Sequence, residues 1–218
     1  FDVPYLGIYN ACSTMSEAFA LSATLIDGGY MQNVVSATGS HFSTAERQYR
    51  YPLELGNTRP PQSQWTVTGA GGTLLAKEGS DLALTSATFG KVVDFGITDV
   101  NNMGAAMAPA ALDTLLAYFE ATGKSPCDFD GIYTGDLGAE GSSILGELLE
   151  ASGVSCGDRL FDCGVMIYDR KRQDVHAGGS GCGCSAVVAA AHLLPELCAG
   201  KQKSILFIKT VNYFFCNF

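Results

Sequence analysis

Cys12 is the residue whose position points most directly to chemistry. It follows an apolar run, residues 3–9, that predicts a buried strand, and it precedes a run, residues 18–26, that predicts an apolar helix. Free amides and the macrodipole at a helix N-terminus stabilise a cysteine thiolate. Cys12 is therefore a candidate nucleophile, although a buried structural cysteine fits the same position.

Two later segments place polar groups where a ligand would bind. Asp136 follows a predicted strand, residues 131–134, and would either orient a ligand or cap the next helix. Gly179 and Ser180 lie in a glycine-rich turn that precedes a predicted helix extending to about residue 197. Backbone amides of such a turn suit a carboxylate or an oxyanion, and the alternative is close packing of strand against helix.

A long segment, residues 39–63, contains further candidates. A loop of this length in a compact domain is usually functional or disordered. His41 would act there as a base or an anion contact, and Arg47 and Arg50 would contact a carboxylate. The same side chains, together with Glu46, also fit an ordinary surface group of ion pairs. A second histidine, in an alanine-rich helix at position 192, is expected to pack in the core.

The residues around Cys12 also predict the elements that would position it. Thr14 and Glu17 match a capping box at the start of the helix, and the Gly28-Gly29 pair ends it. Residues 32–38 predict a second strand. The strand–helix–strand order implies parallel pairing through a right-handed crossover, which indicates an α/β protein.

The remaining pattern continues the α/β alternation. Residues 65–68, 73–76 and 82–89 predict antiparallel strands at a sheet edge, with a small-residue turn at residues 69–72. A helix over residues 105–121 has Pro109 in its first turn. The later predicted elements are strands 131–134, 165–168 and 204–209 and helices 142–151 and 181–197.

The composition narrows the class of protein. The chain has 218 residues, a formal net charge of −9 and 47% hydrophobic residues, so it is able to bury a core. Its 13 Lys and Arg are scattered, which argues against a nucleic-acid partner. The eight cysteines include no CxxC pair and no zinc-type spacing, so no metal site is predicted and a cytosolic origin is simplest. No apolar run is long enough to span a membrane, and the chain begins with Phe1 rather than Met.

The turn formed by residues 11–14 resembles the nucleophile elbow of thiolases and ketoacyl synthases. Longer strings resemble the stage V sporulation protein AD family within that superfamily; they are residues 41–52, 94–99, 103–110 and 177–186. The resemblance implies a thiolase-like α/β/α/β/α layered fold, with residues 1–90 as the rear part of the N-terminal half and residues 91–218 as an incomplete C-terminal half. It also implies that the family's first third is missing, and that the unfamiliar residues 210–218 reflect a frameshift or an interrupted gene.

The resemblance further implies a binding protein rather than an enzyme. Where an active synthase has a catalytic histidine and an asparagine-containing turn, this chain has Asp136 and Ser180. The implied function is therefore non-catalytic binding of dipicolinic acid, a pyridine dicarboxylate, in a degenerate synthase pocket. The implied ligand-binding residues are Cys12, His41, Asp136, Gly179 and Ser180, with Arg47 and Arg50 as further contacts.

The resemblance also implies a setting for this activity. The protein would support uptake of dipicolinic acid into the developing spore, with membrane-embedded proteins of the same operon as partners. It would be a soluble, cytoplasmic-type homodimer associated peripherally with the inner spore membrane, paired through an edge at residues 65–76. No cofactor is expected, and calcium accompanying the ligand stays open. The alternatives are a condensing enzyme that uses Cys12 and a purely structural subunit without small-molecule affinity.

Overall fold

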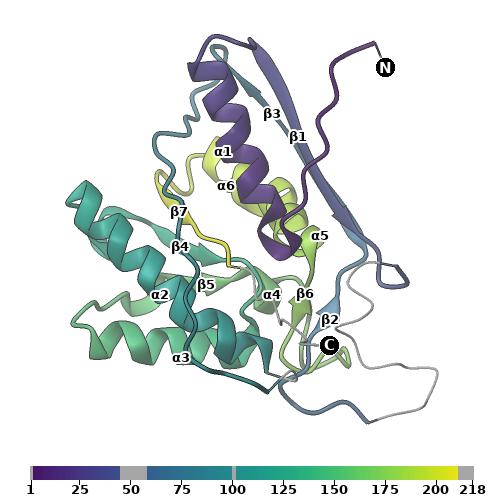
Figure 1. Ribbon diagram of the computed structural model, residues 1–218, viewed down its shortest axis with the longest axis vertical. Helices are drawn as coiled ribbons and strands as arrows, with labels where there is room; N and C mark the ends of the chain where they lie inside the picture. The colour runs from purple at the N-terminus through teal and green to yellow at the C-terminus, as the bar shows by residue number, and fades with distance from the viewer. Residues whose placement is uncertain (1, 45–57, 100–101, 211–218) are drawn as a thin grey trace.

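The computed structural model describes residues 2–44, 58–99 and 102–210 and has a layered α/β architecture (Figure 1). At its centre is a three-stranded parallel sheet in the order β5-β4-β7. The strands are β4 (Gly131–Thr134), β5 (Leu160–Asp162) and β7 (Ile205–Phe207). Every residue of β4 is buried, as expected of the middle strand in a parallel sheet covered on both faces.

The two faces of β4 contribute to different cores. Ile132 packs with α2 (Met103–Thr122) and α3 (Gly138–Ala151). Tyr133, the next residue, packs with α5 (Cys182–Val188) on the other side. Because neighbouring residues of a strand point to opposite faces, the sheet lies between two helical layers.

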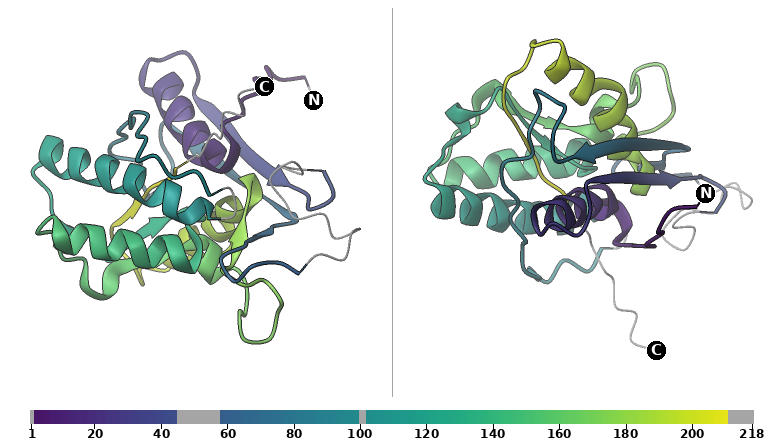
Figure 2. Two further views of the ribbon diagram at one scale, coloured as in Figure 1. Left: turned by 60° about the horizontal axis from the view of Figure 1, so that its bottom comes forward. Right: turned by 90° about the horizontal axis from the view of Figure 1, so that it is seen from above.

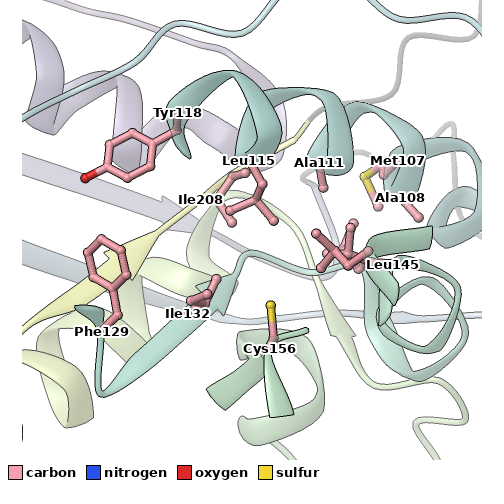
Figure 3. Close-up of a cluster of buried hydrophobic side chains, with 12 residues drawn as sticks. Met107, Ala108, Ala111, Leu115, Tyr118, Phe129, Ile132, Leu145, Cys156 and Ile208 are labelled. Atoms are coloured by element: carbon pink, nitrogen blue, oxygen red, sulfur yellow. The ribbon is translucent and has the colours of Figure 1, made fainter. Parts of the chain in front are cut away.

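The core between α2, α3 and the sheet, drawn in Figure 3, is the larger of the two. Ala111 and Leu115 are four residues apart, which puts them on one face of α2. Figure 3 shows this face pointing toward Ile132, Leu145 and Ile208. Leu115 and Leu145 are completely buried, and each such side chain stabilises the fold by roughly 1.5–3 kcal/mol.

A second sheet lies beyond the other helical layer. It consists of β1 (Asn33–Ser40) and β3 (Gly69–Ala76), paired antiparallel from Asn33↔Ala76 to Ser40↔Gly69. Both α1 (Thr14–Asp27) and α5 pack against this sheet. A Cβ at Gly71 would overlap the backbone carbonyl of Ala186, so the missing side chain allows β3 to approach α5.

The layers therefore follow one another as α2–α3, the parallel sheet, a layer of α1, α5 and α6 (Leu194–Cys198), and the β1–β3 sheet (Figures 1 and 2). This confirms the predicted thiolase-like layered fold for four of its layers. The outer face of β1–β3 carries Val35 at 69% and Leu74 at 63% exposure, and the described residues place no helix over it.

Short elements connect these layers. A pair of parallel strands, β2 (Trp65–Thr66) and β6 (Gly179–Ser180), joins the N-terminal part to the turn before α5. Beyond α5, the helix continues through a π-helical turn, η6 (Ala189–Leu193), into α6 (Leu194–Cys198). The other short elements are η1 (Ala11–Ser13), η4 (Pro126–Asp128), η5 (Gly157–Arg159) and α4 (Cys163–Met166). None of the helices among the described residues combines the length and apolarity needed to cross a lipid bilayer.

Most of the predicted helices are confirmed. α1, α2 and α3 correspond to the helices predicted from residues 18, 105 and 142, and α5 to α6 correspond to the helix predicted over residues 181–197. Gly123, with φ of 67°, ends α2 in the left-handed conformation that glycine adopts easily. Pro109 lies in the second turn of α2 rather than in the first, because the helix already begins at Met103.

Several predicted strands are wrong. Residues 3–9 and 82–89 form no strand, and Tyr5 and Phe89 are 92% and 78% exposed. The small-residue turn predicted at residues 69–72 is part of β3. The predicted parallel pairing of the second strand is also wrong, since β1 pairs antiparallel with β3. Strand propensity depends on a neighbouring strand, and among the described residues none pairs with residues 3–9 or 82–89.

The region around Asp162 was predicted least well. Residues 165–168 were expected to form a strand, but α4 occupies residues 163–166, and β5 was not predicted. The Asp162 carboxylate accepts a hydrogen bond from the Val165 amide and so caps a helical turn. β5 has only three residues, too few to show an alternating pattern.

Candidate functional site

The carboxyl ends of the three parallel strands meet at one edge of the central sheet. Asp162 is the last residue of β5, and Asp136 and Lys209 each follow two residues after the end of β4 and β7. Ligands of open parallel sheets bind at this edge, where loops rather than strands line the surface. Sequence reasoning identified Asp136 alone among these three.

Lys209 brings a positive charge to this edge and close to Cys12. Its Nζ lies 3.4 Å from the carbonyl oxygen of Cys12 and 5.2 Å from the centre of the Phe207 ring. A Cβ at Gly135 would come within 2.9 Å of the same Nζ, so a glycine there leaves space for the lysine side chain. A charged residue directly after an apolar strand, as at Asp136, is the sequence signal that would have identified Lys209.

Cys12 lies in the sharp turn expected of a nucleophile elbow. It is 4% exposed and belongs to η1, directly before α1. The preceding residue, Ala11, has φ of 41°, in the left-handed region that residues other than glycine rarely adopt. Backbone strain of this kind is concentrated at functional sites, which favours a functional interpretation of the turn.

Thr14 fixes this turn, but not through the predicted capping box. Its Oγ1 donates to the Ala11 carbonyl at 2.6 Å and accepts from the Asn10 amide at 3.0 Å. The N-cap residue of α1 is Ser13, which makes no side-chain capping bond, so the capping box of Thr14 with Glu17 is wrong. The reason is that η1 moves the helix start by one residue and leaves Thr14 inside the first turn.

Asp136 connects the end of β4 to the start of α5. Its side chain is 1% exposed, and Oδ2 accepts from the Gly181 amide at 2.9 Å. Among the described residues, Oδ1 is buried without a hydrogen-bond partner. The backbone carbonyl of Asp136 accepts from Gln64 Nε2 at 2.8 Å. Asp136 therefore positions the turn before α5 and does not cap α3, the helix that follows it.

Asp162 is the residue that caps α3, and sequence reasoning missed it. Its carboxylate accepts from Thr134 Oγ1 at 2.7 Å, from the amides of Leu137 and Gly138 at 2.8 and 3.1 Å, and from the Val165 amide at 3.0 Å. Burial raises the pKa of Asp162, and the nearby Asp136 charge acts in the same direction, while the hydrogen bonds oppose both. Its role is structural.

Two core cysteines near Lys209 are unsuited to nucleophilic chemistry. Burial raises the pKa of Cys163 to about 12 and that of Cys184 well above its ordinary value. The Lys209 charge lowers both pKa values but does not overcome burial. Both groups therefore remain thiols at neutral pH, so neither is an alternative to Cys12 as the candidate nucleophile.

The glycine-rich turn at residues 178–181 adjoins the Cys12 turn. Cys182 Sγ lies 4.0 Å from Thr14 Oγ1. The backbone carbonyl of Gly179 accepts from Gln64 at 3.0 Å, and a Cβ at Gly179 would meet Ile167 at 2.6 Å, so this glycine allows close packing. Ser180 is 6% exposed, in the strand β6 beside β2.

The backbone amides at the start of α5, which were predicted to bind an anion, are partly engaged by side chains of the protein itself. The Gly181 amide donates to Asp136, and the Gly183 amide donates to Ser40 Oγ at 2.9 Å. The Ser40 hydroxyl donates in turn to the Val67 carbonyl at 2.7 Å. These amides are engaged within the protein, so Lys209 is the better contact for an anion at this edge.

The predicted basic contacts are not brought to the site. His41 is exposed in the turn after β1, and its Nδ1 accepts from the Ser43 amide at 3.1 Å. Arg47 and Arg50 lie outside the described residues. His192 is exposed in η6, so the prediction that it packs in the core is wrong; the π-helical turn points it to solvent.

The sequence is similar to known proteins over nearly its whole length. The family model described as stage V sporulation protein AD matches residues 1–214. A curated relative, the stage V sporulation protein AD of Bacillus subtilis (strain 168), is 44% identical over 208 residues, which are 95% of this chain. The chain spans 61% of the length of that relative.

A solved structure shows the fold. The tetronic acid condensing enzyme AbyA1 aligns with a TM-score of 0.52 at 14% identity, covering 86% of this chain and 59% of that one. At this identity the likeness concerns the fold alone, and it matches the thiolase-like layers seen here.

Proposed function

The chain belongs to the stage V sporulation protein AD family, and from this premise we propose that it binds dipicolinic acid without catalysing acyl transfer. The observation that supports a dicarboxylate ligand is Lys209, whose ammonium group lies beside the Cys12 turn at the carboxyl edge of the sheet. A pyridine dicarboxylate carries two anionic groups, and charge-assisted hydrogen bonds are the strongest contacts that a protein offers them.

In this proposal the residues at the edge have different roles. Lys209 pairs with one carboxylate, the Cys12 turn forms a wall beside it, and Ser180 offers a hydroxyl. Asp136 positions the Gly181 amide through its hydrogen bond. His41, Gly179, Arg47 and Arg50 remain predictions as ligand contacts.

Any calcium is proposed to bind together with dipicolinic acid and not at a separate site of the protein. Among the described residues no group of three or more His, Cys, Asp or Glu side chains is arranged to hold a metal ion. The buried Oδ1 of Asp136 is a single carboxylate oxygen, which is too small a ligand set for a resident calcium site. Titrations with and without calcium test this point directly.

The proposal excludes catalysis because a thiolate nucleophile needs a base and oxyanion donors beside it. The three histidines lie away from the Cys12 turn: His41 accepts from the Ser43 amide, His176 contacts Pro60 and Asp174, and His192 is exposed in η6. Two amides at the start of α5 are engaged by Asp136 and Ser40.

The second candidate function is an acyl-transferring condensing enzyme that uses Cys12. The strained φ of Ala11 favours it, since such strain marks nucleophile turns. Incubation of the protein with acetyl-CoA, followed by intact mass spectrometry, distinguishes the two functions. A thioester that is absent in Cys12→Ala establishes the enzyme, and an unmodified mass supports the binding protein.

Calorimetry with dipicolinate is the direct test of the proposed function. Lys209→Met keeps the apolar stem over Phe207 and removes the charge, so affinity should fall at least tenfold, or about 1.4 kcal/mol. Lys201→Met is the matched control, because Lys201 pairs with Glu196 at the surface. Cys12→Ala and Ser180→Ala should each weaken binding. No saturable binding by a folded wild-type protein would refute the proposal.

We also propose a cellular location and partners for the protein. Bound dipicolinic acid would be passed toward the developing spore together with membrane-embedded proteins of the same operon, with this protein soluble and peripheral to the inner spore membrane. Homodimerisation through the β3 edge is consistent with the pairing of this strand, which among the described residues pairs with β1 alone. Sedimentation velocity would show a dimer that Leu74→Glu converts to a monomer, and a wild-type monomer at micromolar concentration would contradict it.

A further inference from the structure

His176 lies between two acceptors on two different segments. Its Nδ1 is 2.8 Å from the Pro60 carbonyl oxygen, and its Nε2 is 2.9 Å from Asp174 Oδ1. A carbonyl and a carboxylate accept hydrogen bonds but do not donate them. Only the doubly protonated imidazolium donates from both ring nitrogens, so the protonated ring is the form that satisfies both partners.

The neutral ring has an alternative partner. Ser63 Oγ lies 3.4 Å from Nδ1, farther than the Pro60 carbonyl, and a hydroxyl is able to donate to an unprotonated nitrogen. Loss of one proton would leave Nε2–H on Asp174 and let Nδ1 accept from Ser63. The Pro60 carbonyl then loses its donor, so protonation selects between two hydrogen-bond arrangements.

The charged groups around His176 come from both segments. Asp174 also pairs with Arg59, whose Nη2 is 2.8 Å from Oδ2 and 2.7 Å from the Asp174 carbonyl. Arg170 Nε donates to the carbonyl of His176 itself at 2.9 Å. Among the described residues these three are the charged side chains in direct contact with His176 or with its acceptor.

The backbone at His176 is strained, which makes these contacts necessary. Its φ is 48°, and a left-handed conformation costs a non-glycine residue roughly 1–2 kcal/mol. The side chain is 25% exposed, so solvent reaches the ring.

The two segments that His176 joins lead directly to the candidate site. The Ala177 amide donates to the Ser63 carbonyl at 3.0 Å, and the Trp65 amide donates to the Gly178 carbonyl at 2.8 Å. Gln64 bonds the carbonyls of Asp136 and Gly179. Any change in the pairing of these segments therefore reaches the turn that contains Ser180 and Gly181.

We propose that His176 is a proton-operated latch: the protonated ring fastens residues 58–66 to residues 169–178 and so fixes the β6 turn of the ligand site. In the neutral state the contact with Pro60 opens and the turn is held less firmly. The latch itself depends only on these residues, while its effect on dipicolinate affinity rests on the proposed function.

Trp65 provides a direct readout because it is the only tryptophan in the chain. Its ring stacks on Phe42 at 4.3 Å between centroids, and the Arg59 guanidinium lies 4.7 Å from its centre. Tryptophan emission would therefore be recorded from about pH 8 to pH 5. We expect one sigmoidal transition in the wild type that is lost in His176→Gln.

Two sets of variants make the test decisive. His192→Gln should keep the transition, since His192 is exposed in η6, outside both residues 58–66 and residues 169–178. Ser63→Ala removes the partner of the neutral ring and should move the midpoint to higher pH, which also tests the latch if His176→Gln does not fold. A wild type without a transition, a transition kept in His176→Gln, or an unmoved midpoint in Ser63→Ala would overturn the proposal.

Dipicolinate titrations at both ends of the transition form the second arm. Affinity should be higher at the low-pH end in the wild type and the same at both ends in His176→Gln. If dipicolinate binds at neither pH while the fluorescence transition follows His176, the latch stands and the proposed ligand fails. If dipicolinate binds but the fluorescence transition is the same in wild type and His176→Gln, the proposed ligand is supported and the proposed role of His176 is wrong.

Discussion

The unit formed by residues 102–210 and the part formed by residues 2–99 bury apolar side chains to very different extents. Every member of the large core cluster comes from residues 102–210. Of the fourteen exposed large hydrophobic residues in the described chain, all but Phe161 come from residues 2–99. The division at residue 90 into two halves stays a prediction, but the contrast in burial follows the same order along the chain.

The difference indicates where stability and association reside. The C-terminal unit closes its parallel sheet with α2 and α3, so its apolar surface is used within the chain. The N-terminal part packs α1, β1 and β3 on α5 and leaves Val35, Leu74 and residues 84–97 facing solvent. Exposed apolar side chains grouped in this way mark the part of the described structure that is least covered by its own elements.

The largest expected effect tests this contrast directly. Leu145→Ala removes a completely buried side chain of α3 and should lower the free energy of unfolding by about 2–5 kcal/mol. Val35→Ala removes a similar side chain at a site that is 69% exposed and should change it by about 0.5 kcal/mol or less. Urea denaturation of both variants provides the comparison. Equal losses would show that the outer sheet is as well packed as the core.

Removing Asp162 should have the next largest effect. Asp162→Ala leaves the amides of Leu137, Gly138 and Val165 without their acceptor, and we expect a loss of about 3 kcal/mol. Asp162→Asn keeps one acceptor oxygen and should lose less. Urea denaturation at constant pH measures both, and equal values for the two variants would contradict the capping role.

The same residue predicts a dependence of stability on pH. Because the pKa of Asp162 is higher in the folded state than its ordinary value of 3.8, the folded protein binds more protons in the interval between the two. The contribution of this group to stability is therefore greatest below its ordinary pKa and is lost as pH rises through the folded pKa. The difference between wild type and Asp162→Asn, measured by urea denaturation at several pH values, isolates this slope from that of Asp130, whose pKa is lowered by the Lys203 and Ser204 amides.

A smaller effect should separate the site from the scaffold. Gly135→Ala places a Cβ within 2.5–2.9 Å of the Lys209 side chain, which is flexible and would move away. Dipicolinate affinity should then fall about tenfold, with a stability change of about 1 kcal/mol or less. Gly146→Ala, in α3 with open space at its Cβ, is the matched control and should stabilise the helix by up to about 1 kcal/mol without changing affinity. Unchanged affinity in Gly135→Ala would argue against Lys209 as the anion contact.

The smallest effect concerns the Cys12 turn. Ala11→Gly relieves the left-handed backbone at φ of 41° and should stabilise the protein by about 1 kcal/mol or less. Ala11→Val adds a branched side chain in the same conformation and should destabilise it. Thermal unfolding monitored by circular dichroism distinguishes the two, and a destabilised Ala11→Gly would show that the turn is not strained.

Sequence patterns predicted a helix or strand correctly where the residues of that element themselves carry its spacing and its end signals. α2 and α3 show helical spacing and end near Gly123 and Gly153, and β4 is a short apolar run, so all three were predictable. Residues 3–9 and 82–89 show the same strand-like pattern but pair with no strand among the described residues. Strand formation depends on a partner distant in sequence, which a local pattern does not contain.

The candidate site was predictable to a similar degree. Cys12 and Asp136 were identified because each follows a predicted strand, and the structure places both at the same edge through Gly135, Lys209 and Gly181. Lys209 was missed because the predicted strand extended to residue 209, whereas β7 ends at Phe207 and leaves Lys209 beyond it. Asp162 was missed because its acceptor role depends on three amides that lie up to 25 residues away.

The pairing of β2 with β6 has a consequence for the order in which the chain acquires structure. Trp65 and Gly179 are far apart in sequence, and α5, on which α1, β1 and β3 pack, is near the end of the chain. A ribosome making about 5–20 residues per second therefore delivers α5 on the order of ten seconds after β3. During that interval α1, β1 and β3 lack the helix against which they pack, so this part of the fold forms only after α5 has been made.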